Sequence, residues 1–275
     1  MRTDHADLLA LYDRLGPLAH RYQATILRKL GPGLLVAAAE RLGLYRARTF
    51  ILDSESEMAV VSDLALYDVR INGLNAVQIY QQRYPPVAGS VDEMILGAMA
   101  QARSGIFELT RIVPGVGVEC TDVARGGSVF VANRGLSHSG DIGCAMASRL
   151  LFFPALTMST GADLFMSYDA GREVLAALRK LAAESDIDRQ RVDDPAMWSR
   201  FWTVVIRACL RAGAAREVVY FPSRTFTEQG AEQVVRRYES SLVEGEPPPS
   251  RNRPCPCGSG MKYKHCCGPA KTVAR

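Results

Sequence analysis

Four of the chain's seven cysteines lie close together near the carboxyl end: Cys255, Cys257, Cys266 and Cys267. Thiolates favour zinc, and four of them at about 2.3 Å complete a tetrahedral structural site that leaves no open position for catalysis. A segment this short has no apolar core, so metal binding would supply its folding free energy. His265 is an alternative ligand, because zinc also accepts imidazole nitrogen. The residue types therefore predict structural zinc.

The order Cys-x-Cys, eight residues, Cys-Cys, with Gly-Ser-Gly-x-Lys-Tyr-Lys between the pairs, resembles the SEC-C motif, the zinc-binding tail of the SecA preprotein translocase ATPase. The resemblance covers about residues 252–268, and Met261 stands where that family usually has Lys. It implies a small, mobile, zinc-held module for protein interaction, which in the translocase contacts a chaperone and is associated with ribosomes and membrane lipid. Since they are not needed as ligands, Lys262, Tyr263 and Lys264 are the expected contact residues.

A disulfide framework is the alternative explanation for clustered cysteines, and it would require an oxidising compartment. Asp4, Asp7 and Asp13 interrupt the apolar residues at the amino terminus, so we expect no signal peptide. We also expect no membrane span, since no segment has about eighteen uninterrupted apolar residues. A cytoplasmic protein with bound zinc is the resulting prediction.

Charge is unevenly distributed along the chain. The net charge is +4, but from Arg251 onward there are six basic residues and no carboxylates, which leaves the body near −2. Four thiolates and one zinc ion would reduce the tail to about +4. A cationic tail of this kind suits an acidic protein surface, RNA or anionic lipid.

The body offers few residues for catalysis. His138 is the histidine expected in a loop, and Asp141 or Asp163 could partner it in a hydrolase or nuclease. However, neighbours in sequence rarely form a triad and no Gly-x-Ser-x-Gly elbow is present, so turn chemistry explains these residues and Asp122 better. There is also no P-loop sequence for an ATPase motor. We assign no catalytic residue.

The elements that carry these residues predict an α+β fold. We expect a mainly helical part over residues 1–105, a small all-β part over 106–168 that forms an antiparallel barrel or curved sheet, and further helices over 169–245. Three consecutive prolines predict an extended linker over 246–252, followed by the zinc motif over 253–268. The tail would then be tethered to the body and not packed against it.

Helical periodicity and capping signals predict the individual helices. Asp194 before Pro195 is an N-cap signal, and the apolar stripe from Trp198 to Cys209 is expected to pack in the core, with a groove for a partner as the alternative. The other helices are expected at residues 3–30 with a break at Gly16-Pro17, and at 34–42, 58–68, 75–84, 90–105, 173–181 and 225–242. Ser90, followed three residues later by Glu93, is the capping signal for the helix at 90–105.

Short β-prone runs separated by glycine turns predict strands at 106–113, 116–123, 128–132, 142–153, 155–159 and 164–167. Cys120, Cys144 and Cys209 have apolar neighbours and are expected to be core residues. The segments 104–109, 113–118, 122–127 and 139–142 resemble uncharacterised bacterial proteins that carry the SEC-C motif at the carboxyl end. That resemblance covers about residues 60–165 and implies no activity.

These observations together predict a cytosolic adaptor, and not an enzyme, whose zinc-held cationic tail docks on a chaperone-like or ribosomal protein partner. Two alternatives remain open. One is a hydrolase or nuclease with a site in the β region, recruited by the tail. The other is an RNA-binding protein, whose affinity would fall steeply with salt.

Overall fold

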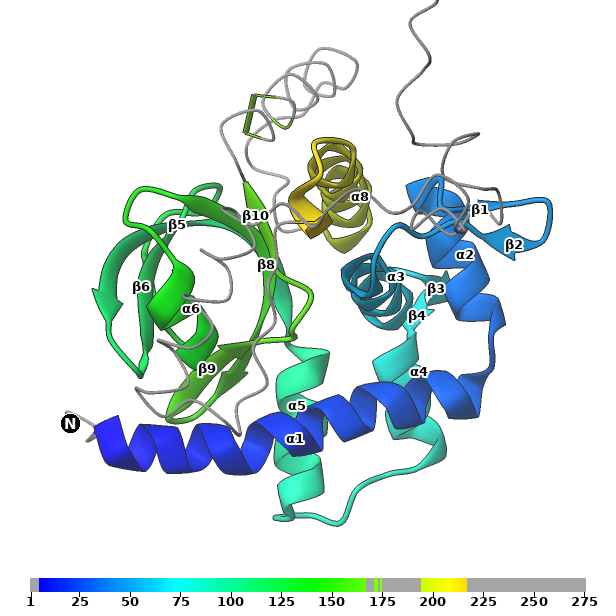
Figure 1. Cartoon of the computed structure of the whole chain (residues 1–275). Helices are drawn as coiled ribbons and strands as arrows, with labels where there is room; N and C mark the ends of the chain where they lie inside the picture. Colours follow the sequence, from blue (N-terminus) through cyan, green and yellow to red (C-terminus); the bar gives the residue numbers. More distant parts are fainter. Residues whose placement is uncertain (1–4, 167–170, 173, 175–193, 217–275) are drawn as a thin grey trace, which may run out of the picture. The chain divides into compact units, whose positions relative to one another are not determined.

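The computed structural model describes residues 5–166, 171–172, 174 and 194–216 (Figure 1). Five helices precede the large sheet in the chain: α1 (His5–Leu30), α2 (Gly33–Leu42), α3 (Glu55–Tyr67), α4 (Ala76–Arg83) and α5 (Val91–Ala100). In the later part of the described chain, the short helix α6 (Arg134–Ser139) lies between strands and the longer helix α8 (Pro195–Arg211) follows the sheet. A 3₁₀ turn, η2 (Ala214–Arg216), ends the described chain. None of the described helices is both long and apolar enough to cross a bilayer.

Side-chain caps fix where several helices begin. Ser54 accepts the backbone N–H of Glu57 at 3.2 Å, and Ser90 accepts that of Glu93 at 3.1 Å. Asn75 and Gln78 form a reciprocal capping box at the start of α4. Each cap satisfies backbone donors that the first helical turn leaves free. The Ser90 signal read from the sequence is thus confirmed.

Helix α1 runs without a break through Gly16 and Pro17, so the predicted interruption is wrong. Proline removes one backbone hydrogen bond, and its ring crowds the preceding residue. Glycine at position 16 has no Cβ to clash with that ring, which reduces the cost of a helical conformation there. Leu15, Ala19 and Ile26 are fully buried along the same helix, and their packing holds it together across the proline.

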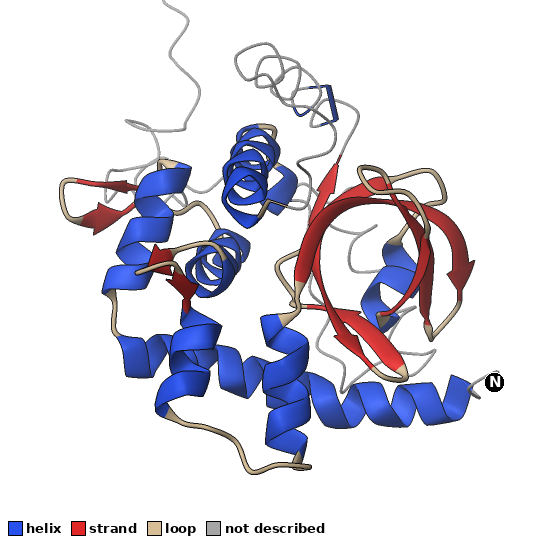
Figure 2. Ribbon diagram, turned by 180° about the vertical axis from the view of Figure 1, so that it is seen from behind, coloured by secondary structure: helices blue, strands red, loops and turns tan. Residues whose placement is uncertain are grey.

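The large sheet is antiparallel and has six strands, in the order β10-β8-β5-β6-β7, with β9 also paired to β8. Strands β7 and β9 lie next to each other, so the sheet curls back toward itself (Figures 1 and 2). The predicted α+β class with a curved antiparallel sheet is confirmed. The strands are β5 (Arg103–Val113), β6 (Gly117–Asp122), β7 (Ser128–Ala132), β8 (Ala145–Phe153), β9 (Leu156–Ser159) and β10 (Leu164–Met166).

The starts of two strands, β5 and β8, differ from the prediction by three residues. Helix α5 ends at Ala100 and β5 already begins at Arg103, so Gly105 lies inside a strand and does not end a helix. A Cβ at Gly105 would lie 2.9 Å from the Phe107 ring, which explains a glycine in this strand. Strand β8 begins at Ala145 instead of Ile142, because Gly143 adopts a positive φ of 88° just before it.

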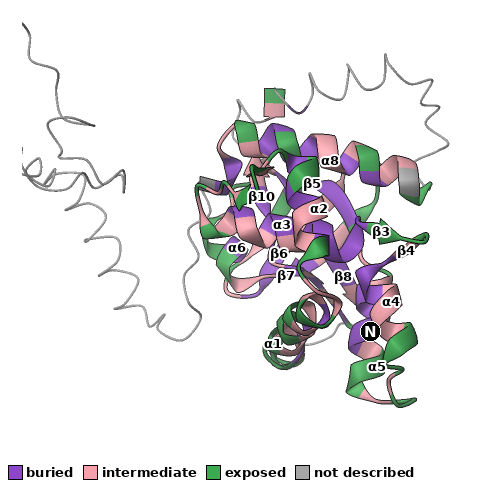
Figure 3. Ribbon diagram, turned by 90° about the vertical axis from the view of Figure 1, so that its right-hand side faces the viewer, coloured by how far each residue is buried: buried purple, intermediate pink, exposed green. Residues whose placement is uncertain are grey.

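The curled sheet separates two hydrophobic cores. The smaller one fills its concave side, where α6 lies against the curled strands (Figure 2). Leu136 of α6 packs there among strand residues. The larger core lies between the other side of the sheet and helices α1, α2, α3, α5 and α8. Figure 3 shows the buried residues concentrated on the strands and on the inner sides of these helices. The smaller core contains Phe107, Leu109, Val118, Cys120, Val131, Leu136, Met146 and Leu150.

Two small hairpins were not predicted: β1 (Tyr45–Arg46) with β2 (Thr49–Phe50), and β3 (Arg70–Ile71) with β4 (Leu74–Asn75). The second turns at Asn72-Gly73, with φ of 53° and 83°. An Asn-Gly pair is a strong signal for a tight hairpin turn, because both residues tolerate a positive φ. The Arg70 guanidinium donates to the Gly73 carbonyl at 2.9 Å and stabilises this turn.

Helix α8 begins as expected, with Asp194 Oδ1 accepting the backbone N–H of Met197 at 3.3 Å. Trp202 is only 1% exposed and Cys209 is buried, so the apolar stripe is core. Trp198 is half-buried; its Nε1 donates to Ser104 Oγ at 2.8 Å and Arg125 covers its ring. These contacts account for the stripe without a partner groove. The segments predicted at 225–242, 246–252 and 253–268 lie outside the described residues, as does most of 173–181.

Candidate functional site

The residues of the hydrolase alternative do not form a site. His138 lies on α6 and not in a loop. Asp163 is buried, and its carboxylate accepts hydrogen bonds from Ser148 Oγ at 2.5 Å and Ser159 Oγ at 2.7 Å. No hydrogen bond or ion pair joins His138 to Asp141 or Asp163 in the described part of the chain. The main support for this alternative is therefore missing.

Turn chemistry explains Asp122 but not Asp163. Asp122 Oδ1 accepts the backbone N–H groups of Ala124 and Arg125, both at 3.0 Å, as expected for an aspartate that begins a turn. Asp163 instead joins two strands of the curled sheet through its serine partners. Burial raises the pKa of Asp163, while hydrogen bonds from Ser148 and Ser159 oppose the shift.

The buried cysteines are not nucleophiles. Cys120 and Cys209 are fully buried, and burial raises the pKa of each thiol to about 12. Only the thiolate reacts or binds metal, so these two groups stay inert near neutral pH. Cys144 is half-buried and also a free thiol.

A buried ion cluster joins the helices to the sheet. Arg149 of β8 is 4% exposed; its Nε donates to Asp63 Oδ2 at 2.9 Å and one terminal nitrogen donates to Asp68 Oδ2. Asp63 Oδ1 also accepts from Thr160 Oγ1 at 2.8 Å, and the Tyr67 ring lies 4.7 Å from the guanidinium carbon. Buried charges are tolerated only when paired in this way. Sequence reasoning missed this cluster, because its members are far apart in the chain.

The cluster carries two carboxylates for one guanidinium. Burial acts against the charge on Arg149, but Asp63 and Asp68 outweigh it and raise the pKa of the guanidinium. Burial raises the pKa of Asp68, which Arg149 only partly opposes. It also raises the pKa of Tyr67, and the Asp63 charge adds to this shift. The site therefore combines a permanent cation with a carboxyl group that is reluctant to ionise.

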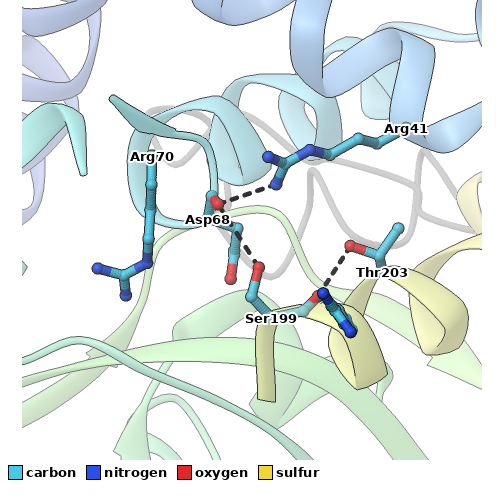
Figure 4. A pocket seen from close by; sticks show the side chains of 6 residues that line it. Arg41, Asp68, Arg70, Ser199 and Thr203 are labelled. Atoms are coloured by element: carbon cyan, nitrogen blue, oxygen red, sulfur yellow. Dashed lines mark hydrogen bonds between the residues drawn. The ribbon is translucent and has the colours of Figure 1, made fainter. Parts of the chain in front are cut away.

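Two cavities lined by described residues reach this cluster, one at Asp68 and the other at Asp63. The first, which we call the Asp68 cavity, has a volume of about 480 Å³ (Figure 4). In Figure 4 the Arg41 guanidinium and the Ser199 hydroxyl both point to the Asp68 backbone carbonyl, which they reach at 2.9 and 3.5 Å. The lining residues come from α2, β3, α8 and the end of α3: Arg41, Asp68, Arg70, Ser199, Arg200 and Thr203.

The second cavity, the His20 cavity, has a volume of about 350 Å³ and reaches Asp63. Burial lowers the pKa of His20, although a hydrogen bond with the Thr160 backbone opposes the shift. Gly161 has a φ of 91°, and a Cβ there would lie 3.3 Å from His20 Nε2. Gln23 donates to the Thr160 carbonyl at 3.3 Å. These contacts tie α1 to the turn after β9, which is a packing role.

The predicted metal and partner residues fall outside this body. Cys255, Cys257, Cys266 and Cys267, together with His265, Lys262, Tyr263 and Lys264, all lie beyond residue 216, where the described chain ends. Among the described residues there is no group of three or more His, Cys, Asp or Glu side chains placed to hold a metal ion. The predicted zinc ligands therefore all lie outside the described residues.

Comparison with protein-family models identifies the family to which the body belongs. Residues 20–200, about two thirds of the chain, match the model of a family of unknown function, DUF7986. The chain belongs to this family. Its model includes all three members of the buried cluster and every residue of the Asp68 cavity except Thr203. The resemblance of the body to uncharacterised proteins is confirmed over a longer range than expected, and no solved structure matches this chain.

The tail of this DUF7986 member matches the SEC-C motif over residues 251–269, which confirms that resemblance. Similar curated proteins are protein translocase subunits SecA, matched only in short segments. Identity is 85% over 20 residues with the subunit of Nitratiruptor sp., 69% over 39 with that of Heliobacterium modesticaldum, and 44% over 45 with that of Halothermothrix orenii. These segments are 7%, 13% and 16% of this chain and 2%, 5% and 5% of the relatives. The chain thus spans a small fraction of those proteins.

Proposed function

We propose that this protein is an adaptor whose SEC-C tail folds around zinc and docks on another macromolecule. The match over residues 251–269 carries the proposal, since it contains all four clustered cysteines. The tail would be one module, residues 253–268, joined by a linker at 246–252 to a body of a helical part (1–105), an all-β part (106–168) and a closing helical segment (169–245).

Zinc fits the donor set of the tail. Cys255, Cys257, Cys266 and Cys267 would hold the ion, with His265 as the alternative fourth ligand. Four thiolates close a tetrahedral site, so the metal supplies folding free energy and no open position for a substrate. Thiolate ligands persist in a reducing compartment, which supports a cytoplasmic location.

The contact surface is proposed to be Lys262, Tyr263 and Lys264. These residues lie between the two cysteine pairs, where a bound metal would fix their turn. Two cations around an aromatic ring suit an acidic protein surface, because the ring supplies contact area and the ammonium groups supply attraction. A chaperone-like or ribosomal protein is the partner class proposed, with RNA as the competing ligand.

Binding to purified ribosomes tests this role. Wild-type protein is expected to co-sediment with ribosomes, and K262A/Y263A/K264A is expected to lose this binding while keeping its zinc. The matched control K271A removes a tail charge outside the motif and should bind like wild type. Parallel binding to purified chaperones tests the other partner class.

Three results would contradict the proposal. Zinc loss in the triple variant would mean that these residues maintain the fold. Equal weakening by K271A would indicate general charge attraction. Binding to protein-free ribosomal RNA as tight as to ribosomes, with affinity falling about a thousandfold from about 50 to about 200 mM salt, would favour the RNA-binding alternative.

A further inference from the structure

Three arginines from separate elements line the Asp68 cavity. Arg41 lies in the last turn of α2, Arg70 begins β3, and Arg200 lies near the start of α8. Each is exposed, although the cavity reaches the buried Asp68. Residues distant in sequence have therefore been brought to one concave surface, which a run of charges along a single helix would not achieve.

No carboxylate among the described residues forms an ion pair with any of these three guanidinium groups. Within the described residues, the ion pairs involve other arginines: Arg111, Arg125, Arg134 and Arg149. Arg41 and Arg70 each donate one hydrogen bond to a backbone carbonyl, of Asp68 and Gly73. A guanidinium has five N–H donors, so both are held in place with donors to spare. The cavity rim therefore presents fixed positive charge.

The floor of the cavity is anchored and nearly balanced in charge. Asp68 is bound by Arg149 behind it, and Arg149 is bound in turn by Asp63. Even with both carboxylates ionised, this cluster carries only one excess negative charge against the three arginines at the rim. An anion entering the cavity would thus meet net positive charge on a rigid support. Ser199 and Thr203 of α8 also line the cavity, and their hydroxyl groups donate to the backbone carbonyls of Asp68 and Ser199.

From this arrangement we propose that the Asp68 cavity binds the phosphate groups of a small phosphorylated ligand. The planar arginine fork matches phosphate oxygens in pairs, and such bonds are about twice as strong as neutral ones. A volume of about 480 Å³ lies in the range of small-molecule sites. Asp68 on the floor would accept a hydroxyl or amino hydrogen of the same ligand.

This site is separate from the zinc tail in both residues and chemistry, so either proposal can fail alone. Arg200 is the residue to change, because no hydrogen bond or ion pair of the described chain depends on its side chain. Arg83 at the end of α4 is the matched control: it is an exposed arginine on a helix and lies outside the cavity lining. R70Q/R200Q is a stronger variant of the same design.

Calorimetric titration of the full-length protein tests the proposal, with pyrophosphate and ADP as small probes and a short single-stranded RNA as the polymeric one. We expect saturable binding of pyrophosphate or ADP, weakened about tenfold in R200Q and unchanged in R83Q. Circular dichroism of R200Q should match wild type, which shows that lost binding is not lost folding.

Two results would overturn the proposal. If neither pyrophosphate nor ADP binds, or if R83Q weakens binding as much as R200Q, the arginines form an ordinary solvated surface. If RNA binds more tightly than both small probes and loses affinity in R200Q, the cavity takes phosphates from a nucleic acid, and its assignment to a small ligand is wrong.

Discussion

Arg149 and Asp63 are separated by 86 positions in the chain and meet in its interior, where Arg149 Nε donates to Asp63 Oδ2 at 2.9 Å. Arg149 belongs to the curled sheet and Asp63 to helix α3, so their contact joins the two layers of the body. The same guanidinium holds Asp68, which lines the Asp68 cavity, while Asp63 lines the His20 cavity. The buried guanidinium of Arg149 therefore holds a residue of both the Asp68 cavity and the His20 cavity.

Replacing Arg149 should destabilise the folded protein. R149M leaves Asp63 and Asp68 buried without a cation, and we expect the free energy of unfolding to fall by about 3–5 kcal/mol. R111M is the control, because it breaks the exposed Arg111–Glu119 pair, and solvent screening should make its loss of stability much smaller than that of R149M. Urea unfolding measures both. Similar losses in the two variants would contradict the role given to the cluster.

Asp163 should make stability depend on pH. Burial raises the pKa of Asp163 in the folded state above its usual value of 3.8. At a pH between 3.8 and the raised pKa, the native state therefore binds more protons than the unfolded state. Stability contributed by its protonated form is therefore complete below 3.8 and is lost as pH rises through the raised pKa. In urea unfolding from about pH 4 to about pH 7, wild type should lose stability relative to D163N. The opposite trend would show that the carboxylate is stabilised by its serine partners more than burial penalises it.

Gly117 should be intolerant of a side chain. A Cβ there would overlap the carbonyl oxygen of Val131 on the neighbouring strand, so G117A must force β6 and β7 apart and destabilise the sheet by about 1–3 kcal/mol. Apart from its chain neighbours and the nearby backbone of α5 itself, Gly97 has nothing within 4 Å of the corresponding position, so G97A should stabilise the protein by about 0.5–1 kcal/mol through helix propensity. Thermal unfolding of both variants checks the pair. A neutral G117A would contradict the close approach of these strands.

Local signals in the sequence predicted the elements well. Ser90 and Asp194 marked helix starts, because a cap acts on backbone groups only a few residues away. Glycines in turns marked the strands of the curled sheet for the same reason. Asn72-Gly73 is an equally local signal for a hairpin, although our predictions did not include that hairpin. The break predicted at Gly16-Pro17 is wrong because burial of Leu15 and Ala19 holds the helix together there, and local sequence does not reveal that burial.

The candidate site of the body could not be predicted in the same way. Arg149 is one of many arginines, and nothing near it indicates that Asp63 and Asp68 will surround it. Arg41, Arg70 and Arg200 likewise look like ordinary surface charges until the fold places them around one cavity. The tail is the reverse case. Its chemistry lies within a few consecutive residues, so Cys255 and Cys266 are informative without any fold.

Zinc content is the most direct test of the central proposal. Full-length protein purified under reducing conditions is analysed by native mass spectrometry, together with C255S/C257S, C266S/C267S and the control C144S, which removes a free thiol of the body. We expect about one zinc ion per chain in wild type and C144S, and none in either double variant. Wild-type protein without zinc, or double variants that retain it, would contradict a zinc-held tail.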